Sequence, residues 1–150
     1  MAKIEEEIKQ KSFKSEYHKL TINLLFTHGW LLECHKKLFS NYNITLAQYN
    51  VLRILRGQYP SAVSISSINS RMIDKMSDTS RLVERLRVKG FISRTECMND
   101  RRKSDVVITK AGMSLLKSLD YIDKEFDEIF STITNKEAKL LNQILDKLRG

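Results

Sequence analysis

Two neighbouring stretches of the chain carry side chains suited to binding a polyanion. Residues 77–89 combine short hydroxyl side chains with arginines, and a second run reads Arg101-Arg102-Lys103. Hydroxyl groups can approach base edges closely, and the guanidinium fork reaches guanine edges or phosphate oxygens. Three adjacent cations on a loop repel one another unless a phosphate backbone or a minor groove lies close by. These residue types indicate nucleic-acid contacts.

The net charge is concentrated in the same part of the sequence. The 150 residues include 26 basic and 18 acidic ones, which gives a formal net charge of +8. Eleven basic and six acidic residues fall between positions 71 and 110, the largest local excess. A localised basic region is typical of proteins that neutralise phosphates and release their counterions. The alternative is a solvated basic surface without a polyanionic partner.

The segment from Ser77 to Lys89 divides into two faces when residues are placed at 100° intervals. One face is expected to pack on the core, and it carries Thr79, Leu82, Val83 and Leu86. The opposite face carries Ser77, Arg81, Glu84 and Val88, flanked by Ser80, Arg85 and Arg87. A DNA-recognition helix needs this division, because its inner side must be fixed while its outer side reads bases. The alternative is an exposed helix whose charges serve only solubility.

Hydrophobic periodicity predicts the elements that position this segment. Amphipathic helices are expected over residues 15–39, 45–56, 66–72 and 77–89. Thr45 is expected to cap the second helix, which Gly57 and Pro60 should end. Gly90 is expected just past the fourth helix, where a left-handed backbone is cheapest for a residue without a Cβ.

After Gly90 the spacing of apolar residues changes from the helical period to that of a β-strand. Residues 91–96 and 104–108 predict two short strands joined by the polar residues 98–103, which makes a hairpin with a basic tip. An ordinary charged turn is the alternative for that tip. Helical periodicity returns between residues 113 and 130, and Thr134 and Glu137 have capping-box spacing at the start of a last helix. The predicted fold is mainly α with a small β-hairpin wing: a winged helix-turn-helix with N- and C-terminal dimerisation helices.

The run from Thr45 to Leu119 resembles the MarR family of bacterial transcriptional regulators, and the resemblance extends in outline over the whole chain. It is carried by the motifs Leu46-x-x-Tyr49-x-Val51-Leu52, Ser80-Arg81-Leu82-Val83-x-Arg85-Leu86-x-x-Lys89-Gly90-Phe91-Ile92-x-Arg94, Asp100-Arg101-Arg102 and Ile108-Thr109-x-x-Gly112. The sequence departs from the family pattern in the turn Met72-Ile73-Asp74-Lys75, which lacks a glycine often found there. It also departs at Met76, where a polar residue is common.

The resemblance implies one domain over residues 1–150. In it, about 45–110 form a winged-helix DNA-binding lobe, and about 10–40 and 111–150 form a helical dimerisation region. It further implies a homodimer that binds a pseudo-palindromic operator in double-stranded DNA, with each recognition helix in a major groove and each wing at the neighbouring minor groove. The implied function is sequence-specific transcriptional regulation, by a repressor that a small effector releases.

The resemblance and the residue pattern together assign candidate sites. The expected DNA contacts are Ser77, Asp78, Thr79, Ser80, Arg81, Arg85, Arg101, Arg102 and Lys103. Arg94 and Asp100 are expected to brace the wing as an ion pair. The candidate lining of an effector pocket is His28, Trp30, His35 and Tyr49. Cys34 is a candidate redox-sensing thiol; simple core packing is the alternative for it and for each pocket residue.

Other classes of function find little support in the sequence. His28, Cys34 and His35 offer only one local set of metal ligands, so we expect no metal and no cofactor. The sequence contains no nucleophile elbow and no phosphate-binding glycine loop, so we expect no enzyme. The uncharged stretch Leu20–Leu32 is shorter than the roughly 18 apolar residues of a membrane span, so we expect a cytoplasmic protein without a membrane partner. The competing function is a winged-helix protein-interaction or dimerisation module whose wing meets an acidic partner.

Overall fold

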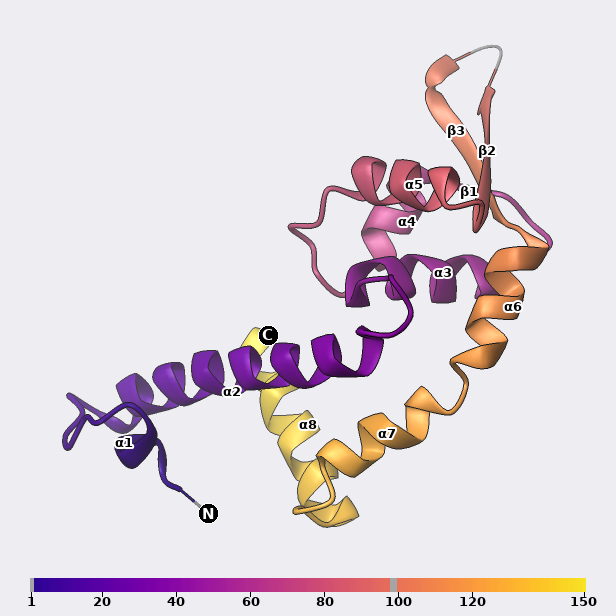
Figure 1. The fold of residues 1–150 in the computed structure, drawn as a ribbon. Helices are drawn as coiled ribbons and strands as arrows, with labels where there is room; N and C mark the ends of the chain where they lie inside the picture. The colour runs from indigo at the N-terminus through magenta and orange to yellow at the C-terminus, as the bar shows by residue number, and fades with distance from the viewer. Residues whose placement is uncertain (1, 98–99) are drawn as a thin grey trace. The chain divides into compact units, whose positions relative to one another are not determined.

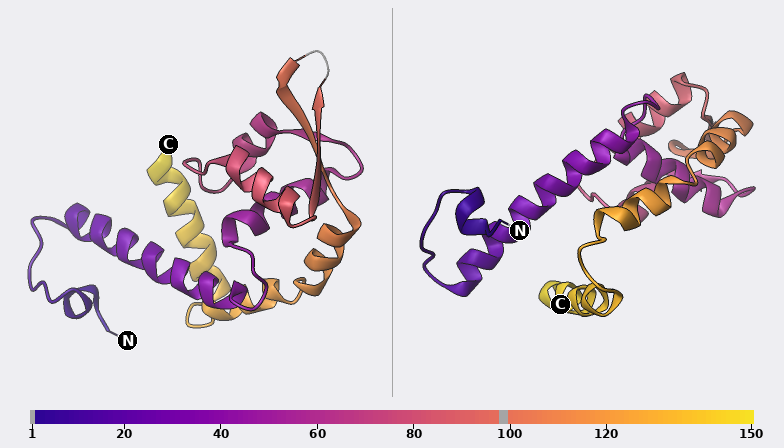
Figure 2. Two further views of the ribbon diagram at one scale, coloured as in Figure 1. Left: turned by 45° about the horizontal axis from the view of Figure 1, so that its top comes forward. Right: turned by 60° about the horizontal axis from the view of Figure 1, so that its bottom comes forward.

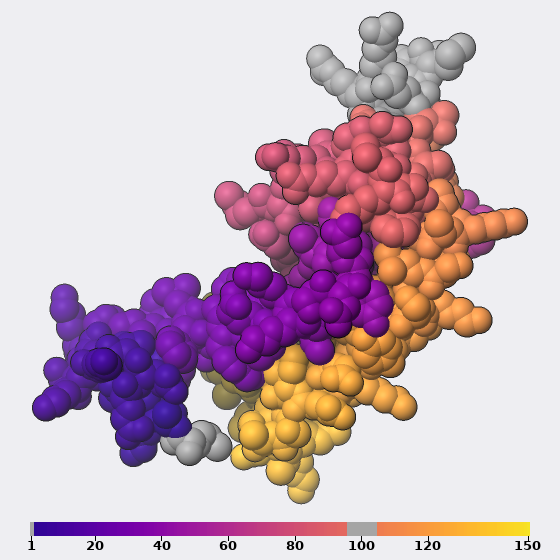
Figure 3. Space-filling view, in the orientation of Figure 1, coloured from indigo at the N-terminus to yellow at the C-terminus, as the bar shows by residue number. Residues whose placement is uncertain are grey.

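The structure is a computed structural model that describes residues 2–97 and 100–150; the side chains of residues 96–104 lie outside the described part. The chain forms two compact units, Met1–Leu38 and Phe39–Gly150. Figure 1 shows the order of the elements along the chain, Figure 2 shows the ribbon in two further views, and Figure 3 shows a space-filling view in the orientation of Figure 1. None of the described helices is long and apolar enough to cross a membrane.

The first unit contains helix α1 (Ile4–Glu7) and most of helix α2 (Glu16–Phe39). The two helices are joined by an ion pair between Lys19 Nζ and Glu5 Oε1 at 2.5 Å, and Ile4 is buried. Lys19 Nζ also lies 5.9 Å from the centroid of the Phe13 ring, a cation–π contact. Several large apolar side chains of α2 are exposed: Tyr17, Leu20, Leu25, Phe26, Trp30 and Leu32.

The second unit begins with three helices around a small sheet. The helices are α3 (Leu46–Gln58), α4 (Ile65–Arg71) and α5 (Thr79–Val88), and the strands are β1 (Val63–Ser64), β2 (Ile92–Cys97) and β3 (Asp100–Ile108). The sheet is antiparallel in the order β1-β3-β2, with Val106 of β3 paired to both Val63 and Arg94. Three further helices follow: α6 (Lys110–Ser118), α7 (Ile122–Ile129) and α8 (Asn135–Arg149).

Side-chain caps fix where these helices begin, as the sequence predicts for two of them. The hydroxyl of Thr45 accepts a hydrogen bond from the Gln48 amide at 3.2 Å, and the Thr45 amide donates one to the Gln48 side chain in return. Thr134 and Glu137 form the same reciprocal box at the start of α8. Gly90 follows α5 with φ of 77°, the left-handed conformation expected for it.

One continuous apolar core holds the second unit together. Its fully buried members come from α3, α5, β3, the start of α7, and α4 and α6 with the residues that cap their C-terminal ends: Val51, Leu52, Leu55, Ile68, Met72, Val83, Leu86, Val106, Leu116, Leu119 and Ile122. By contrast, no residue of α8 is buried. The core therefore fixes α5 and the sheet on one scaffold, as a binding surface requires.

The structure corrects the sequence-based boundaries in several places. Helix α1 was not expected, and the helical region predicted over residues 113–130 is divided between α6 and α7. Helix α3 runs on to Gln58, so Gly57 lies inside the helix instead of ending it. Strand β3 begins at Asp100, so residues 100–103 belong to the strand and not to the predicted loop; the ladder continues past a register shift between Glu96 and Cys97. Backbone pairing can extend a hairpin through charged residues, because the ladder does not depend on side-chain polarity. Strand β1 was not expected, since two residues give no periodic signal.

Candidate nucleic-acid interface

Helices α4 and α5 and the turn between them form the helix-turn-helix. Thr79 begins α5, and its hydroxyl donates a hydrogen bond to Asn69 Oδ1 on α4 at 2.7 Å. Thr79, Val83 and Leu86 are buried and Leu82 is half-buried, which confirms the predicted inward face. The opposite side of α5 is therefore the side open to solvent.

The N-terminal end of α5 presents several of the predicted DNA contacts. The Asp78 carboxylate caps the helix by accepting a hydrogen bond from the Arg81 amide at 3.0 Å. Ser80, Arg81 and Arg85 are exposed, and Ser77 is half-buried. Within the described part of the chain, neither Arg81 nor Arg85 forms an ion pair with a carboxylate. Both guanidinium groups are therefore available to an anionic partner.

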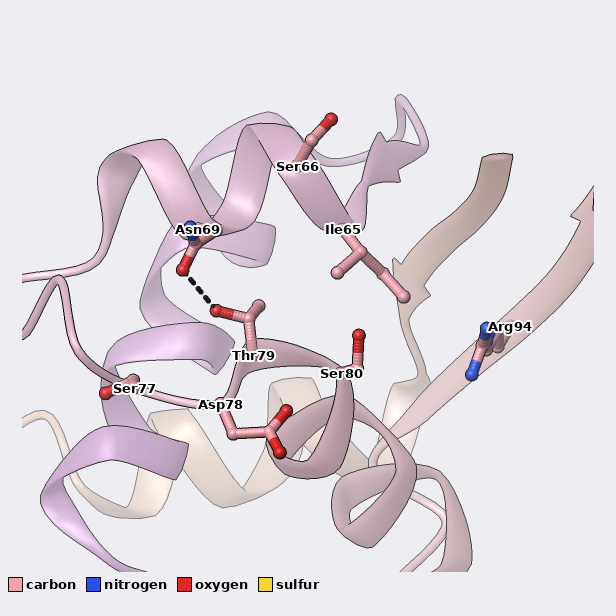
Figure 4. A pocket seen from close by; sticks show the side chains of 8 residues that line it. All are labelled: Ile65, Ser66, Asn69, Ser77, Asp78, Thr79, Ser80 and Arg94. Carbon is pink, nitrogen blue, oxygen red and sulfur yellow. Dashed lines mark hydrogen bonds between the residues drawn. The ribbon is translucent and has the colours of Figure 1, made fainter. Parts of the chain in front are cut away.

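An open groove of about 550 Å³ lies beside this end of α5 (Figure 4). Its lining comes from α4, the start of α5 and β2: Ile65, Ser66, Asn69, Ser77, Asp78, Thr79, Ser80 and Arg94. Figure 4 shows the Thr79 hydroxyl directed at Asn69, with Ser80 on α5 and Arg94 on the neighbouring strand. Hydroxyl, amide and guanidinium groups thus line the groove together with the Asp78 carboxylate and the apolar side chain of Ile65.

A charge cluster joins the far part of α5 to the wing. The Arg87 guanidinium donates to both carboxylate oxygens of Glu84, with distances of 2.7 to 3.2 Å. Arg94 Nη1 on β2 lies 4.0 Å from Glu84 Oε2. The hydrogen bonds from Arg87, with the nearby charge of Arg94, hold the pKa of Glu84 below its ordinary value. Glu84 therefore stays ionised between two arginines.

The basic end of the wing is only partly described. The backbones of Asp100, Arg101, Arg102 and Lys103 lie in β3, but their side chains are outside the described part. The predicted pair between Arg94 and Asp100 thus stays a prediction. The described carboxylate nearest to Arg94 is Glu84, a partner that the sequence pattern did not indicate.

The candidate effector residues are divided between the two units. His28 and Trp30 are exposed on α2 and His35 is half-buried there, which lowers the pKa of its imidazole. Tyr49 lies in the core of the second unit, with its ring centroid 4.9 Å from that of Phe39. Their common pocket stays a prediction. So does redox sensing by Cys34, which is half-buried with a free thiol.

Sequence reasoning missed three polar contacts that join α3 and the segment before it to the start of α7 and the turn between α6 and α7. Arg53 Nη1 contacts Asp123 Oδ1 at 2.9 Å and donates to the Tyr49 hydroxyl at 3.0 Å. Arg56 Nη1 lies 2.8 Å from Asp120 Oδ1. The hydroxyls of Tyr42 and Tyr121 are 2.6 Å apart. Apart from Tyr49 and Arg53, which lie one turn apart on α3, the partners are 64 to 79 residues apart in the sequence. No local sequence pattern therefore predicts these long-range contacts.

Comparison with known proteins identifies the protein family of this chain. Residues 44–104 match the MarR family. The HTH-type transcriptional regulator PecS of Dickeya dadantii is 31% identical over 116 residues, which cover 75% of this chain and 69% of PecS. The chain belongs to the MarR family.

Solved structures of similar fold agree with this MarR assignment. The MarR transcription factor from Planctomyces limnophilus is 26% identical, with a TM-score of 0.69 over 90% of this chain and 98% of the other. The organohalide-sensing regulator RdhR-CbdbA1625, in its 2,4-dichlorophenol-bound form, gives a TM-score of 0.80 over 93% and 85% of the two chains. At 16% identity this second likeness concerns the fold alone. The MarR-family chain is a transcriptional regulator with a winged helix-turn-helix.

In the described part of this MarR-family chain, no group of three His, Cys, Asp or Glu residues is arranged to hold a metal ion. The exposed side chains at the N-terminal end of α5 include the Ser80 hydroxyl and the guanidinium groups of Arg81 and Arg85. Such groups bind phosphates and base edges without changing covalent bonds.

Proposed function

We propose that this regulator binds a pseudo-palindromic operator in double-stranded DNA as a homodimer, and represses transcription until a small effector releases it. The observation that carries the proposal is the division of α5. The helix buries Thr79, Val83 and Leu86 while it exposes Ser80 and Arg81 at its N-terminal end. A major groove admits a helix held in this way, and the first residues of such a helix reach the base edges.

Each predicted contact residue of α5 then has a distinct role. Ser77, Ser80 and Arg81 are proposed to read base edges, and Arg85 is proposed to bind phosphate. Asp78 fixes the first turn by capping it. Thr79 is buried and its hydroxyl is bonded to Asn69, so we assign it the positioning of α5 against α4.

The wing supplies the second contact in this proposal. Arg101, Arg102 and Lys103 lie near the start of β3, where they would meet phosphates or a narrow minor groove beside the α5 site. Arg94 and Asp100 are proposed to brace the hairpin. Because Arg94 also lies near Glu84, the wing and α5 share one electrostatic connection.

Dimerisation through the terminal regions, about 10–40 and 111–150, is supported by unpartnered apolar side chains in each unit. On α8, Leu140, Leu141, Ile144 and Leu148 follow one helical stripe and are all exposed. On α2, the exposed apolar residues include Leu25, Phe26 and Trp30. Contiguous exposed apolar surface of this kind marks protein–protein interfaces. A second copy of the chain is the occupant that a two-fold operator needs.

Release by an effector is proposed by analogy with RdhR-CbdbA1625, whose structure contains 2,4-dichlorophenol. His28, Trp30, His35 and Tyr49 are the proposed lining, because aromatic and imidazole groups suit a small aromatic ligand. Oxidation of Cys34 is a second proposed route to release, which peroxide treatment would reveal.

Selection of bound duplexes from a random DNA pool tests the main proposal. The expected product is an inverted repeat whose half-sites lie on one face of the helix, with an affinity that falls steeply as salt rises. An Ile144→Glu substitution should convert the dimer to a monomer in light scattering and weaken operator binding. A matched Lys139→Glu substitution on the same helix should leave the dimer intact. Failure to retain any duplex at low salt would favour a protein-interaction module instead.

A further inference from the structure

The turn between α4 and α5 holds two large apolar side chains in almost full contact with solvent. Ile73 is 81% exposed and Met76 is 91% exposed, whereas the adjacent Met72 is buried in the core. Single exposed apolar residues are common on protein surfaces. Two of them in one short turn, directly before the recognition helix, make a surface that has no partner among the described residues.

Hydrogen bonds hold the backbone of this turn in place. The Ile73 amide donates to Asn50 Oδ1 of α3 at 3.0 Å. The Met76 amide donates to Asp74 Oδ1 at 2.9 Å, and the Ser77 hydroxyl donates to Asp74 Oδ2 at 3.1 Å. The turn is thus tied both to α3 and to itself. Met76 is presented outward by a fixed main chain, and this lowers the entropy that contact with a partner would cost.

The charges around the pair favour a polyanion over an apolar protein surface. Arg71, Lys75 and Arg81 are exposed on the residues that flank it. The two acidic groups nearby, Asp74 and Asp78, are engaged as acceptors of main-chain amides. The pair is also continuous with the N-terminal end of α5, the part of the proposed DNA site that reaches base edges. These charges and this position indicate that the partner of Ile73 and Met76 is the major groove of DNA.

The thymine C5-methyl is the apolar group that base pairs offer in the major groove. We propose that Met76, with Ile73 beside it, contacts thymine methyl groups in each half-site and sets a preference for A·T pairs there. The unbranched thioether of methionine adapts to such a contact without one rigid geometry. This inference rests on the proposed DNA binding and adds to it a specificity-determining residue.

Deoxyuridine tests the contact directly, since it differs from thymidine only by the methyl. Operators from the random-pool selection are made with deoxyuridine at one thymine position at a time, in both half-sites. Affinity is measured by fluorescence anisotropy for the wild type, Met76→Gln and Ile73→Gln. Val88→Gln is the matched control, because Val88 is 72% exposed at the opposite end of α5. Thermal unfolding followed by circular dichroism confirms that each variant folds.

For the wild type, removal of the methyl at the contacted position should weaken binding about fourfold per half-site, the value of one buried methyl group. Met76→Gln should bind the thymidine and deoxyuridine operators equally, whereas Val88→Gln should keep the wild-type difference. The proposal is overturned if the wild type tolerates deoxyuridine everywhere, or if the penalty persists in both turn variants. It is equally overturned if Met76→Gln leaves the DNA affinity and the preferred sequence unchanged, which would assign the pair to a protein partner. Absence of duplex binding in every sample would instead contradict the proposed function itself.

Discussion

The hydroxyl of Thr79 donates a hydrogen bond to Asn69 Oδ1 over 2.7 Å, and this contact joins the two helices of the helix-turn-helix. Thr79 is the first residue of α5 and is buried, while Asn69 lies near the end of α4 and is exposed. Together with the apolar core that Ile68 and Val83 share, the bond ties the N-terminal end of α5 to α4. Ser80 and Arg81 follow directly, so their direction depends on it.

Thr79→Val should reduce both stability and DNA affinity, because it keeps the shape of the side chain but removes the donor. We expect the free energy of unfolding in urea to fall by about 1 kcal/mol, the typical net value of one hydrogen bond. Thr79→Ser, which keeps the hydroxyl, should bind DNA more tightly than Thr79→Val. Wild-type affinity in Thr79→Val would show that the bond does not position α5.

Substitutions in α5 and in the wing should change DNA binding in different ways. Arg81→Ala should change which sequences are preferred, because its guanidinium is proposed to reach a base edge. Arg102→Ala should weaken binding to all duplexes, and the slope of log affinity against log salt should become shallower by about 1 for each phosphate that is no longer neutralised. Anisotropy titrations at several salt concentrations, on selected and scrambled duplexes, separate the two effects. Identical behaviour of both variants would contradict the assigned roles.

Gly112→Ala should destabilise the second unit. A Cβ at this position would lie 2.3 Å from the Phe91 carbonyl oxygen and 2.7 Å from Ile108 Cγ1. Such overpacking costs about 1–3 kcal/mol, which urea unfolding would detect. Gly57→Ala is the control, because Gly57 lies inside α3 and a Cβ there would have no atom within 4 Å beyond its chain neighbours and the backbone of its own helix. That variant should be as stable as the wild type or more stable by up to about 1 kcal/mol.

The ion pair between Glu84 and Arg87 should contribute stability that depends on pH. Hydrogen bonds from Arg87 lower the pKa of Glu84 in the folded state, so its contribution is present above the ordinary value of 4.5. This contribution to stability disappears as the pH falls through the lowered pKa that Glu84 has in the folded state. Glu84→Gln should therefore be slightly less stable than the wild type at pH 7, and the difference should vanish in acid. Urea unfolding between pH 7 and pH 3 measures it, with Glu128→Gln as the control. A difference that grows in acid would contradict the assignment.

The sequence alone determined the local features of this protein. The cap at Thr45 with Gln48, the box of Thr134 with Glu137 and the left-handed Gly90 each depend on a few adjacent residues. The inward face of α5 follows from helical periodicity, and it is confirmed by the burial of Val83 and Leu86. These features are set by backbone sterics and by side-chain hydrogen bonds within one turn. They can therefore be predicted without knowledge of the tertiary structure.

Only the tertiary structure decided which distant groups meet. The bond from Thr79 to Asn69, the approach of Arg94 to Glu84 and the contact between Tyr42 and Tyr121 each depend on how separate elements pack. Strand β1 exists because its two residues pair with Val106 and Asp105 of β3, a partner more than 40 positions away. Such contacts form when a shared apolar core brings the elements together, and burial of that core is non-directional. The sequence therefore names the groups that can interact, but packing selects the partners.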